Sequence, residues 1–536
     1  MTDENDHQAL RMRLGLAVWR RMCRHLDGIA VGATVAACAE AGVFAALVRS
    51  DGPLDIDTLA AVHASPRGYF HLALRLFEEQ GWVVRQGAGD SGRTSVCLTA
   101  AGRAWLDHIG CYRRSAAALD TAADLFAALV KGTGFDGRRL AAFHGSAADG
   151  GAVATRVRDH LWGPLAAAAT SGLKRSGRLA DRDPVVAAAL AVLEAQGWAR
   201  REDGAMIPTE AGRLALEWAE QYDHAISYFP TYAAVAERLF PPRRQPARAA
   251  FDLDHHLDRR LDIAFSGTVF SRTCRDSFFA LALPLFDKPP AAAQPAAVID
   301  TGAGDGSLLR ELHLAIRDRT GRGRTLAANP LMMVGVEPSA VARAVMAQRL
   351  AEDGVPAVVV EGDIGDPAAI AARLQPLGID FAAALHVSKS VIHDRRYQPP
   401  TARQEPSAAL PWPASDAVFV AEDGGLIAHA AMQDDLVRHF RRWIPWIRRH
   451  GMIAIEAHTV PAALIAAHEG RNVMTGLDAS HGYSHQYLVE RPTYLRAAAE
   501  AGLVAAASRA LAAEMLGTPI LTIDYWQPAP AARQSA

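Results

Sequence analysis

The strongest constraint on the fold of this chain is a glycine-rich stretch at residues 298–309, which reads VIDTGAGDGSLL. An apolar run at 296–299 ends in Asp300, and Gly302, Gly304 and Gly306 follow. A helical pattern of apolar residues continues to about residue 317. Glycine lets the backbone approach a ligand closely, and the first turn of a helix offers unpaired N–H groups. The stretch therefore predicts a strand, a tight turn and a helix that bind a ligand together.

Two further apolar runs end in acidic residues. The run at 332–336 precedes Glu337, where a carboxylate can accept both hydroxyls of a ribose. The run at 357–360 leads to Asp363 and Ile364, where a carboxylate can accept an adenine amino group. The spacing G-x-G-x-G also differs from the G-x-G-x-x-G of dinucleotide-binding folds.

These residues together resemble the class I S-adenosylmethionine-dependent methyltransferases. The resemblance implies that Asp300, Gly302, Gly304 and Gly306 hold the amino acid part of the cofactor, Glu337 the ribose, and Asp363 with Ile364 the adenine. It also implies an α/β catalytic domain at 296–530 with a Rossmann-like, seven-stranded sheet. Strands are expected near residues 296, 332, 357, 381, 452, 504 and 520, and the last two as an antiparallel hairpin. A nucleotide-free α/β domain is the alternative.

The N-terminal half contains an internal duplication. Residues 77–84 read FEEQGWVV and residues 193–200 read LEAQGWAR, and LTAAGR at 98–103 corresponds to IPTEAGR at 207–213. The two copies are separated by the length of a whole domain, which indicates two tandem units rather than a solenoid. We expect winged-helix-like α+β units at 1–110 and 111–220, followed by a helical lid at 221–290. Because the candidate recognition helices carry few basic residues, we favour a role other than DNA binding.

Composition excludes several classes of protein. The 536 residues suggest two to four domains, and a formal net charge of −2 gives no general attraction to nucleic acid. No apolar run has the length of a membrane span, and the polar start is unlike a signal peptide. The five cysteines are scattered and form no C-x-x-C motif. We therefore expect a cytoplasmic protein without a membrane partner.

Candidate catalytic residues follow the predicted fourth and fifth strands. The fourth is followed by His386, His393 and Asp394, and the fifth by Glu456. Ligands of open α/β sheets bind beyond the carboxyl ends of the strands. A histidine with an ordinary pKa suits proton removal from a methyl acceptor. His386 and His393 are the predicted bases, and Asp394 and Glu456 could orient the imidazole.

A second resemblance is to the carbon-methylating modules of polyketide assembly lines, especially the apratoxin loading-module type. It is carried by the segments 266–276, 386–397 and 481–486. Part of that group uses iron or manganese to chelate a malonyl-type substrate, which implies a metal site at His458, His481, His485 and Gln486. The alternative is that His481 and His485, four residues apart, only share a helix face.

These observations predict a biosynthetic methyltransferase that uses S-adenosylmethionine and methylates carbon of an acyl-thioester or polyketide-like substrate. An oxygen-methyltransferase of a small natural product is the runner-up, and a winged-helix regulator with a methyltransferase-like sensor domain is the rival of another class. The predicted partner is a small-molecule or carrier-protein-bound acyl substrate. Homodimer formation is left open.

Overall fold

The computed structural model describes residues 2–87, 94–143, 151–179, 182–241, 255–400 and 411–530. The chain divides into two compact units. The first comprises Met1–Leu261, Val418–Ile427 and Pro461–His485, and the second comprises Asp262–Ala417, Ala428–Val460 and Gln486–Ala536. The chain therefore returns to the first unit twice after leaving it. Part of the predicted lid, residues 242–254, lies outside the described residues.

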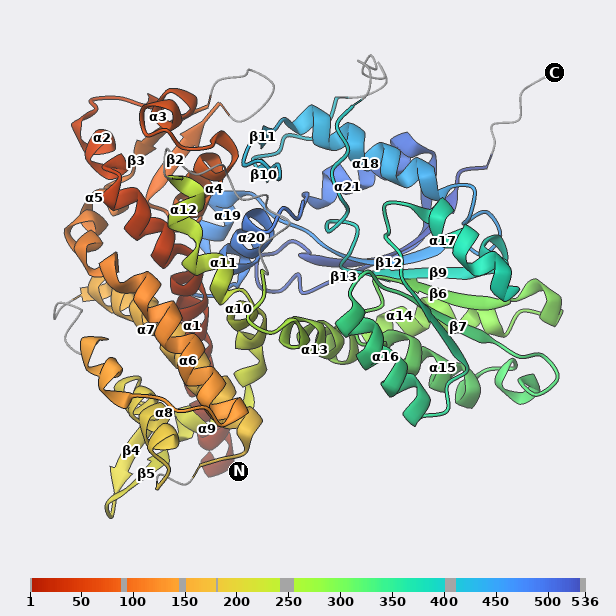
Figure 1. Ribbon diagram of the computed structural model, residues 1–536, viewed down its shortest axis with the longest axis horizontal. Coiled ribbons are helices and arrows are strands. Elements are labelled where there is room, and N and C mark those ends of the chain that lie inside the picture. The colour runs from red at the N-terminus through yellow and green to blue at the C-terminus, as the bar shows by residue number, and fades with distance from the viewer. Residues whose placement is uncertain are drawn as a thin grey trace. The chain divides into compact units, whose positions relative to one another are not determined.

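The second unit is built on a seven-stranded sheet with the order β13-β14-β12-β9-β6-β7-β8 (Figure 1). The strands are β6 (Ala297–Thr301), β7 (Met332–Val336), β8 (Ala357–Val360), β9 (Leu385–Lys389), β12 (Met452–Ala457), β13 (Leu503–Leu511) and β14 (Leu521–Pro528). The pairs between β12 and β8 are parallel, whereas β14 runs antiparallel to both β12 and β13. This confirms the predicted class I methyltransferase sheet and its terminal hairpin.

Helices cover both faces of this sheet. They are α13 (Arg259–Val269), α14 (Arg275–Ala282), α15 (Ser307–Arg319), α16 (Ala340–Glu352), α17 (Pro367–Leu374), α18 (His429–Trp443) and α21 (Arg491–Ala501). Figure 1 shows α14, α15 and α16 on one face and α17, α18 and α21 on the other. The core between them is apolar, as expected for parallel strands buried on both sides.

The fourth strand begins later than predicted. Residues Phe381–Ala383 form a short 3₁₀ turn, and the strand starts at Leu385. The turn begins at Asp380, whose side chain accepts a hydrogen bond from the Ala382 amide. An Asp at this position favours a turn over an extended strand. The prediction from the apolar run alone therefore set the start of the fourth strand too early.

The first unit is mainly helical. Its helices are α1 (Thr2–Glu40), α2 (Val43–Arg49), α3 (Ile56–Val62), α4 (Arg67–Glu79), α5 (Ala100–Trp105), α6 (Ser115–Lys131), α7 (Gly151–Ser176), α8 (Pro184–Ala195), α9 (Glu210–Glu217), α10 (Asp223–Ser227), α11 (Phe229–Ala233), α12 (Val235–Leu239), α19 (Ala462–Ala467) and α20 (Met474–Tyr483). Its strands are β1 (Leu54–Asp55), β2 (Val83–Gln86), β3 (Ser95–Leu98), β4 (Ala199–Glu202), β5 (Ala205–Pro208), β10 (Phe419–Val420) and β11 (Leu426–Ile427). The long helices α1 and α7 cross at Gly28 and Gly163, where a Cβ would collide with the opposite backbone.

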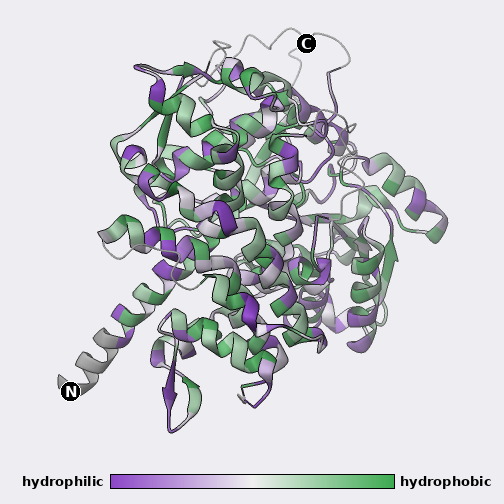
Figure 2. Cartoon of the chain, turned by 60° about the vertical axis from the view of Figure 1, so that its left-hand side comes forward, coloured by the Kyte–Doolittle hydropathy of each residue, from purple (hydrophilic) through white to green (hydrophobic). Residues whose placement is uncertain are grey.

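The duplicated sequence forms the same local structure twice. A helix (α4 or α8) leads into an antiparallel hairpin (β2–β3 or β4–β5), and a threonine then caps the next helix. The amides of Thr99 and Thr209 donate to the carbonyls of Trp82 and Trp198, at 3.0 and 2.9 Å. The first hairpin pairs with β1 as a third strand. The second hairpin is polar along β4 (Figure 2), and the last three residues of that strand are exposed.

Membrane-spanning character is weak throughout the residues that the structure describes. No single helix there is long and apolar enough to cross a membrane. The helices Arg11–Glu40 and Val43–Arg49 meet the length and composition requirement only when they are taken together, and the pair is bent by 69°.

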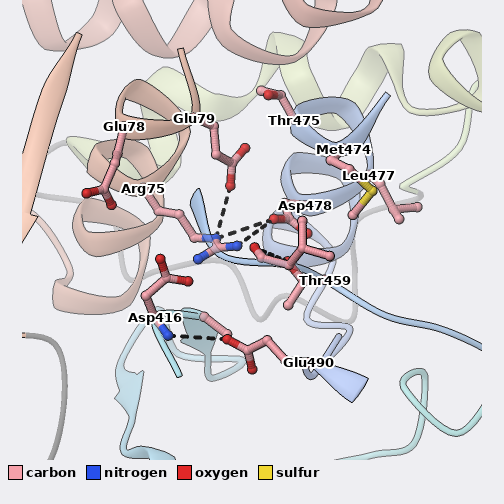
Figure 3. A network of polar contacts seen from close by, with 12 residues as sticks. Arg75, Glu78, Glu79, Asp416, Thr459, Met474, Thr475, Leu477, Asp478 and Glu490 are labelled. Carbon is pink, nitrogen blue, oxygen red and sulfur yellow. Dashed lines mark hydrogen bonds and ion pairs between the residues drawn. The ribbon is translucent and has the colours of Figure 1, made fainter. Parts of the chain in front are cut away.

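Within the first unit, a buried ionic group joins the returning segment 461–485 to α4 (Figure 3). Arg75 of α4 pairs through Nε with Glu79 Oε1 at 3.0 Å and through Nη2 with Asp478 Oδ2 of α20 at 2.9 Å. The exposed fractions of these three residues are 2%, 1% and 6%. Next to them, Gln80 Nε2 donates to Thr475 Oγ1 at 3.1 Å. Polar contacts thus connect α4 to a helix about 400 residues later in the chain.

We expect Arg75→Met to lower the free energy of unfolding by about 3–5 kcal/mol, because it leaves two buried carboxylates without their cation. The control is Arg67→Met on the same helix, where an exposed arginine pairs with Asp57 and the expected loss is within about 1 kcal/mol. Chemical denaturation of both variants measures the difference. Equal losses would contradict a structural role for the buried group.

Candidate functional site

The loop between β6 and α15 has a left-handed backbone at all three glycines. The φ angles of Gly302, Gly304 and Gly306 are +78°, +54° and +76°. A Cβ on Gly302 would overlap Val391, and one on Gly306 would lie 2.7 Å from Met346 Cγ. A Cβ on Gly304 would find no atom nearer than 3.8 Å. Packing therefore requires the outer two glycines, while the middle one borders open space.

Two acidic residues lie beside this loop. Asp300 is 2% exposed, and its Oδ1 has no hydrogen-bond partner within the described residues. Burial, and then the nearby carboxylate of Glu337, raises the pKa of Asp300 to about 8. Glu337 accepts hydrogen bonds from the amides of Gly304 at 3.1 Å and Ser339 at 3.0 Å. Beside the loop thus lie one carboxyl group with a raised pKa and an unpartnered Oδ1, and one carboxylate fixed by backbone amides.

The third predicted acid follows β8. Asp363 is exposed, and its Oδ1 accepts a hydrogen bond from the Gly365 amide at 2.7 Å. Ile364 is buried, and its carbonyl accepts from Trp443 Nε1 at 3.0 Å. These bonds fix the turn after β8, so the carboxylate stands at the edge of the sheet.

Lys389 was not predicted as a site residue. It ends β9 and lines a cavity of about 30 Å³ together with Asp300, Gly302, Gly304 and residues of α13. Its Nζ donates to Ser266 Oγ of α13 at 2.7 Å, and burial lowers the pKa of its ammonium group. A lysine at the carboxyl end of a central strand was the available sequence signal.

His393 and Glu456 form a buried pair beyond the ends of β9 and β12. His393 Nδ1 hydrogen-bonds Glu456 Oε1, and the amides of Ile392 and Ala457 each donate to the same carboxylate at 3.0 Å. Burial alone would raise the pKa of Glu456, but the neighbouring His393 holds this pKa below its usual value. The exposed fractions are 5% and 2%. The hydrogen bond to Glu456 thus fixes the orientation of the His393 ring.

Two other predicted catalytic residues lie elsewhere. His386 is the second residue of β9 and fully buried, with Nε2 bonded to the Phe381 carbonyl at 2.9 Å and the ring against Trp443. Burial lowers the pKa of His386 to about 4. Asp394 is exposed on the turn after the strand.

The four predicted metal ligands are distributed over both units. His458 Nε2 bonds Thr522 Oγ1 at 2.8 Å, and Gln486 follows in the second unit. In the first unit, His481 Nδ1 bonds the Leu477 carbonyl at 2.7 Å and His485 Nε2 bonds Tyr69 OH at 2.8 Å. Within the described ranges, no three His, Cys, Asp or Glu side chains gather to hold a metal ion. The iron or manganese site therefore stays a prediction.

Two family models match the chain. The AprA MT2-like domain matches residues 254–513, and the AprA N-terminal domain matches residues 20–85. Together they cover more than half of the sequence. The chain belongs to the AprA-type methyltransferases. With the class I sheet, this membership makes it an S-adenosylmethionine-dependent methyltransferase.

Several solved structures of methyltransferases match the chain at low identity. An O-methyltransferase family 2 protein from Planctomyces limnophilus is 10% identical, with 96% of each chain covered and a TM-score of 0.40. CalO1 of calicheamicin biosynthesis is 17% identical, with 81% of this chain and 100% of that chain covered and a TM-score of 0.33. The CurJ carbon methyltransferase is 11% identical, with 77% and 91% covered and a TM-score of 0.31. No curated protein sequence matches this AprA-type methyltransferase.

Gly304→Val should abolish cofactor binding without unfolding the methyltransferase, because its side chain enters the open space at the loop. Calorimetry with S-adenosylhomocysteine measures the affinity. The control is Gly354→Val, which places valine at a φ of +64° where nothing lies within 4 Å of the Cβ. Both variants should lose about 1–3 kcal/mol of stability through backbone strain. Unchanged affinity in Gly304→Val would disprove the assignment of the loop.

Asp300→Asn should stabilise the cofactor-free protein and weaken cofactor binding. An unfolded Asp has a pKa of about 3.9, and in the fold it is about 8. Between these values the folded state holds the extra proton, so the free energy of unfolding falls as the pH rises. Asparagine removes this loss. The free energy of unfolding of Asp300→Asn should therefore exceed that of the wild type by roughly a few kcal/mol at pH 8 and equal it at about pH 4. Denaturation at both pH values tests this; a pH-independent difference would contradict it.

Proposed function

We propose that the glycine loop and the acids beside it hold S-adenosylmethionine as the resemblance implies. The unpartnered Oδ1 of Asp300 suits the cofactor's amino group, and Lys389 in the same cavity suits its carboxylate. The two oxygens of Glu337 already accept backbone amides and keep lone pairs for the ribose hydroxyls. Asp363 and Ile364 would contact the adenine.

The cavity is too small for the whole cofactor while α13 lies on the loop. It measures about 30 Å³, whereas small-molecule sites usually measure about 300–1,000 Å³. Ser266 contacts Lys389, and a Cβ on Gly267 would lie 2.6 Å from Asp305 Oδ2. We therefore assign α13 the role of the predicted lid, which lifts to admit the cofactor.

The reaction that the site supports best is methylation of an acidic carbon, such as the α-carbon of an acyl thioester or β-dicarbonyl compound. The single observation that carries the assignment of the base is the buried His393–Glu456 pair, and the resemblance to carbon-methylating modules favours carbon as the acceptor. S-adenosylmethionine supplies an electrophilic methyl group. With Glu456 on Nδ1, the Nε2 of His393 can remove the proton from the acceptor carbon. Glu456 then stabilises the imidazolium that forms.

The turn that carries His393 is fixed against the cofactor loop. Val391 occupies the space that a Cβ on Gly302 would need. Ser390 has a φ of +55°, and its amide donates to the Ile455 carbonyl at 2.8 Å. Strained residues of this kind persist where the surrounding structure requires them. The base and the methyl donor would thus be held in a fixed relation, which favours in-line transfer.

Oxygen methylation of a hydroxylated natural product uses the same base and remains the runner-up. The predicted metal site at His458, His481, His485 and Gln486 stays a prediction, and the proposed step uses only the side chains of this chain. The acceptor can be a free small molecule or borne on a carrier protein. For the N-terminal repeats we propose a role other than DNA binding, and homodimer formation is one such role.

His393→Ala should lower turnover by about 10²–10⁴-fold at nearly unchanged cofactor affinity, because it removes the base. Glu456→Gln should lower turnover less, because the imidazole stays but loses its orienting charge. Single-turnover assays with S-adenosylmethionine and malonyl-type or phenolic acceptors measure the rates.

His386→Ala is the matched comparison. It removes a buried ring from the sheet and should reduce stability while leaving turnover per folded molecule near that of the wild type. The opposite pattern, a slow His386 variant and an active His393 variant, would overturn the assignment of the base.

A further inference from the structure

The duplication in the first unit extends to its two long helices. Residues 21–28 of α1 read RMCRHLDG and residues 156–163 of α7 read RVRDHLWG, so an arginine, a histidine, a leucine and a glycine recur at the same spacing. The helix α1 precedes the unit from α4 to β3, and α7 precedes the equivalent unit from α8 to β5. Each copy therefore consists of a leading long helix and a helix–hairpin unit.

The histidine of each leading helix binds the copy to which that helix does not belong. His25 of α1 hydrogen-bonds Tyr222 OH of the second copy through Nδ1 at 2.7 Å. His160 of α7 hydrogen-bonds Tyr112 OH of the first copy through Nδ1 at 2.9 Å. The two tyrosines follow the capped helices α5 and α9, so they hold similar places in the two copies. The leading helices are thus exchanged between the copies.

The arginines make the same exchange. Arg21 donates through Nη1 to the Gln196 carbonyl before the second hairpin. Arg156 donates through Nη2 to the Gln80 carbonyl before the first hairpin at 3.1 Å. Both glutamines directly precede the repeated Gly-Trp sequence, so the two carbonyls are equivalent. A second pair of contacts therefore obeys the rule that the histidines obey.

The two leading helices also contact one another reciprocally (Figure 1). A Cβ on Gly28 would lie 2.2 Å from His160 Cα, and a Cβ on Gly163 would lie 2.9 Å from His25 Cα. Each glycine is therefore required by the backbone of the histidine on the opposite helix. Such mutual contacts between equivalent residues are the mark of a twofold interface, which usually joins two copies of one chain.

We propose that the first unit is an internal dimer, in which residues 21–112 and 156–222 pair as two copies of one chain would, with their leading helices exchanged. Because His25 and His160 are buried in this pairing, at 0% and 1% exposure, another molecule of the protein cannot use the same interface. The partner of each copy is thus the other copy within the chain. The protein is accordingly a monomer, and pairing within the chain takes the place of homodimer formation as the role of the repeats.

The two copies differ at the helix that receives the returning segments. In the first copy the amide of Gly68 donates to the Gly424 carbonyl at 2.9 Å, and Arg75 forms the ionic group with α20. Counted back from the repeated Gly-Trp, the equivalent residues of α8 are Pro184, which lacks an N–H, and Ala191. The second copy therefore cannot hold a returning segment through these two contacts, and one pair of copies serves a single methyltransferase sheet.

Double-mutant cycles on the full-length protein test the exchange. His25→Phe with Tyr222→Phe, and His160→Phe with Tyr112→Phe, should each change the unfolding equilibrium constant by a factor that differs about 2-fold or more from the product of the single changes. The matched controls combine the same substitutions within one copy, His25→Phe with Tyr112→Phe and His160→Phe with Tyr222→Phe. There the single changes should multiply within about 2-fold. Chemical denaturation measures every variant.

Sedimentation equilibrium of the wild type tests the pairing without any substitution, so it stands even where a histidine variant does not fold. We expect the mass of one chain at every concentration. A wild-type dimer would overturn the internal dimer. The exchange would be refuted by cycles that show no coupling between the copies, or that show it within one copy instead.

Discussion

Everything at the candidate site depends on the backbone between β6 and α15, which takes positive φ angles at Gly302, Gly304 and Gly306. This conformation lets Val391 pack where a side chain on Gly302 would stand, and Met346 where one on Gly306 would stand. The first contact fixes the turn after β9, and the second fixes α16 against α15. The position of His393 relative to Asp300 therefore depends on the absence of a side chain at Gly302.

The two buried carboxyl groups at the site, Asp300 and Glu456, differ in their hydrogen-bond partners and in their pKa values. Asp300 has no hydrogen-bond donor for one of its oxygens, and burial keeps it neutral near pH 7. Glu456, by contrast, accepts three hydrogen bonds and stays ionised although it is equally buried. The two carboxyl groups therefore differ in charge because they differ in donors. We propose that Asp300 takes its partner from the cofactor, whereas Glu456 has its partners within the protein.

Local sequence was enough to predict the sheet and the turn at the three glycines, whereas the roles of the three acids and of His393 with Glu456 stay predictions. It could not separate His386 from His393, because only the exact start of β9 shows that His386 lies inside the sheet. Lys389 was missed because its importance comes from Ser266 and Asp300, far away in the sequence. The discontinuous first unit was also beyond prediction, since nothing local in 461–485 shows that Asp478 meets Arg75.

That discontinuity has a consequence during synthesis. A ribosome adds about 5–20 residues each second, so α20 emerges on the order of tens of seconds after α4. Until then Arg75 has Glu79 as its partner on α4 but lacks Asp478. The first unit can begin to fold early but is completed only after most of the catalytic sheet has been made. Assembly of the two units is thus interleaved in time, although each has its own core.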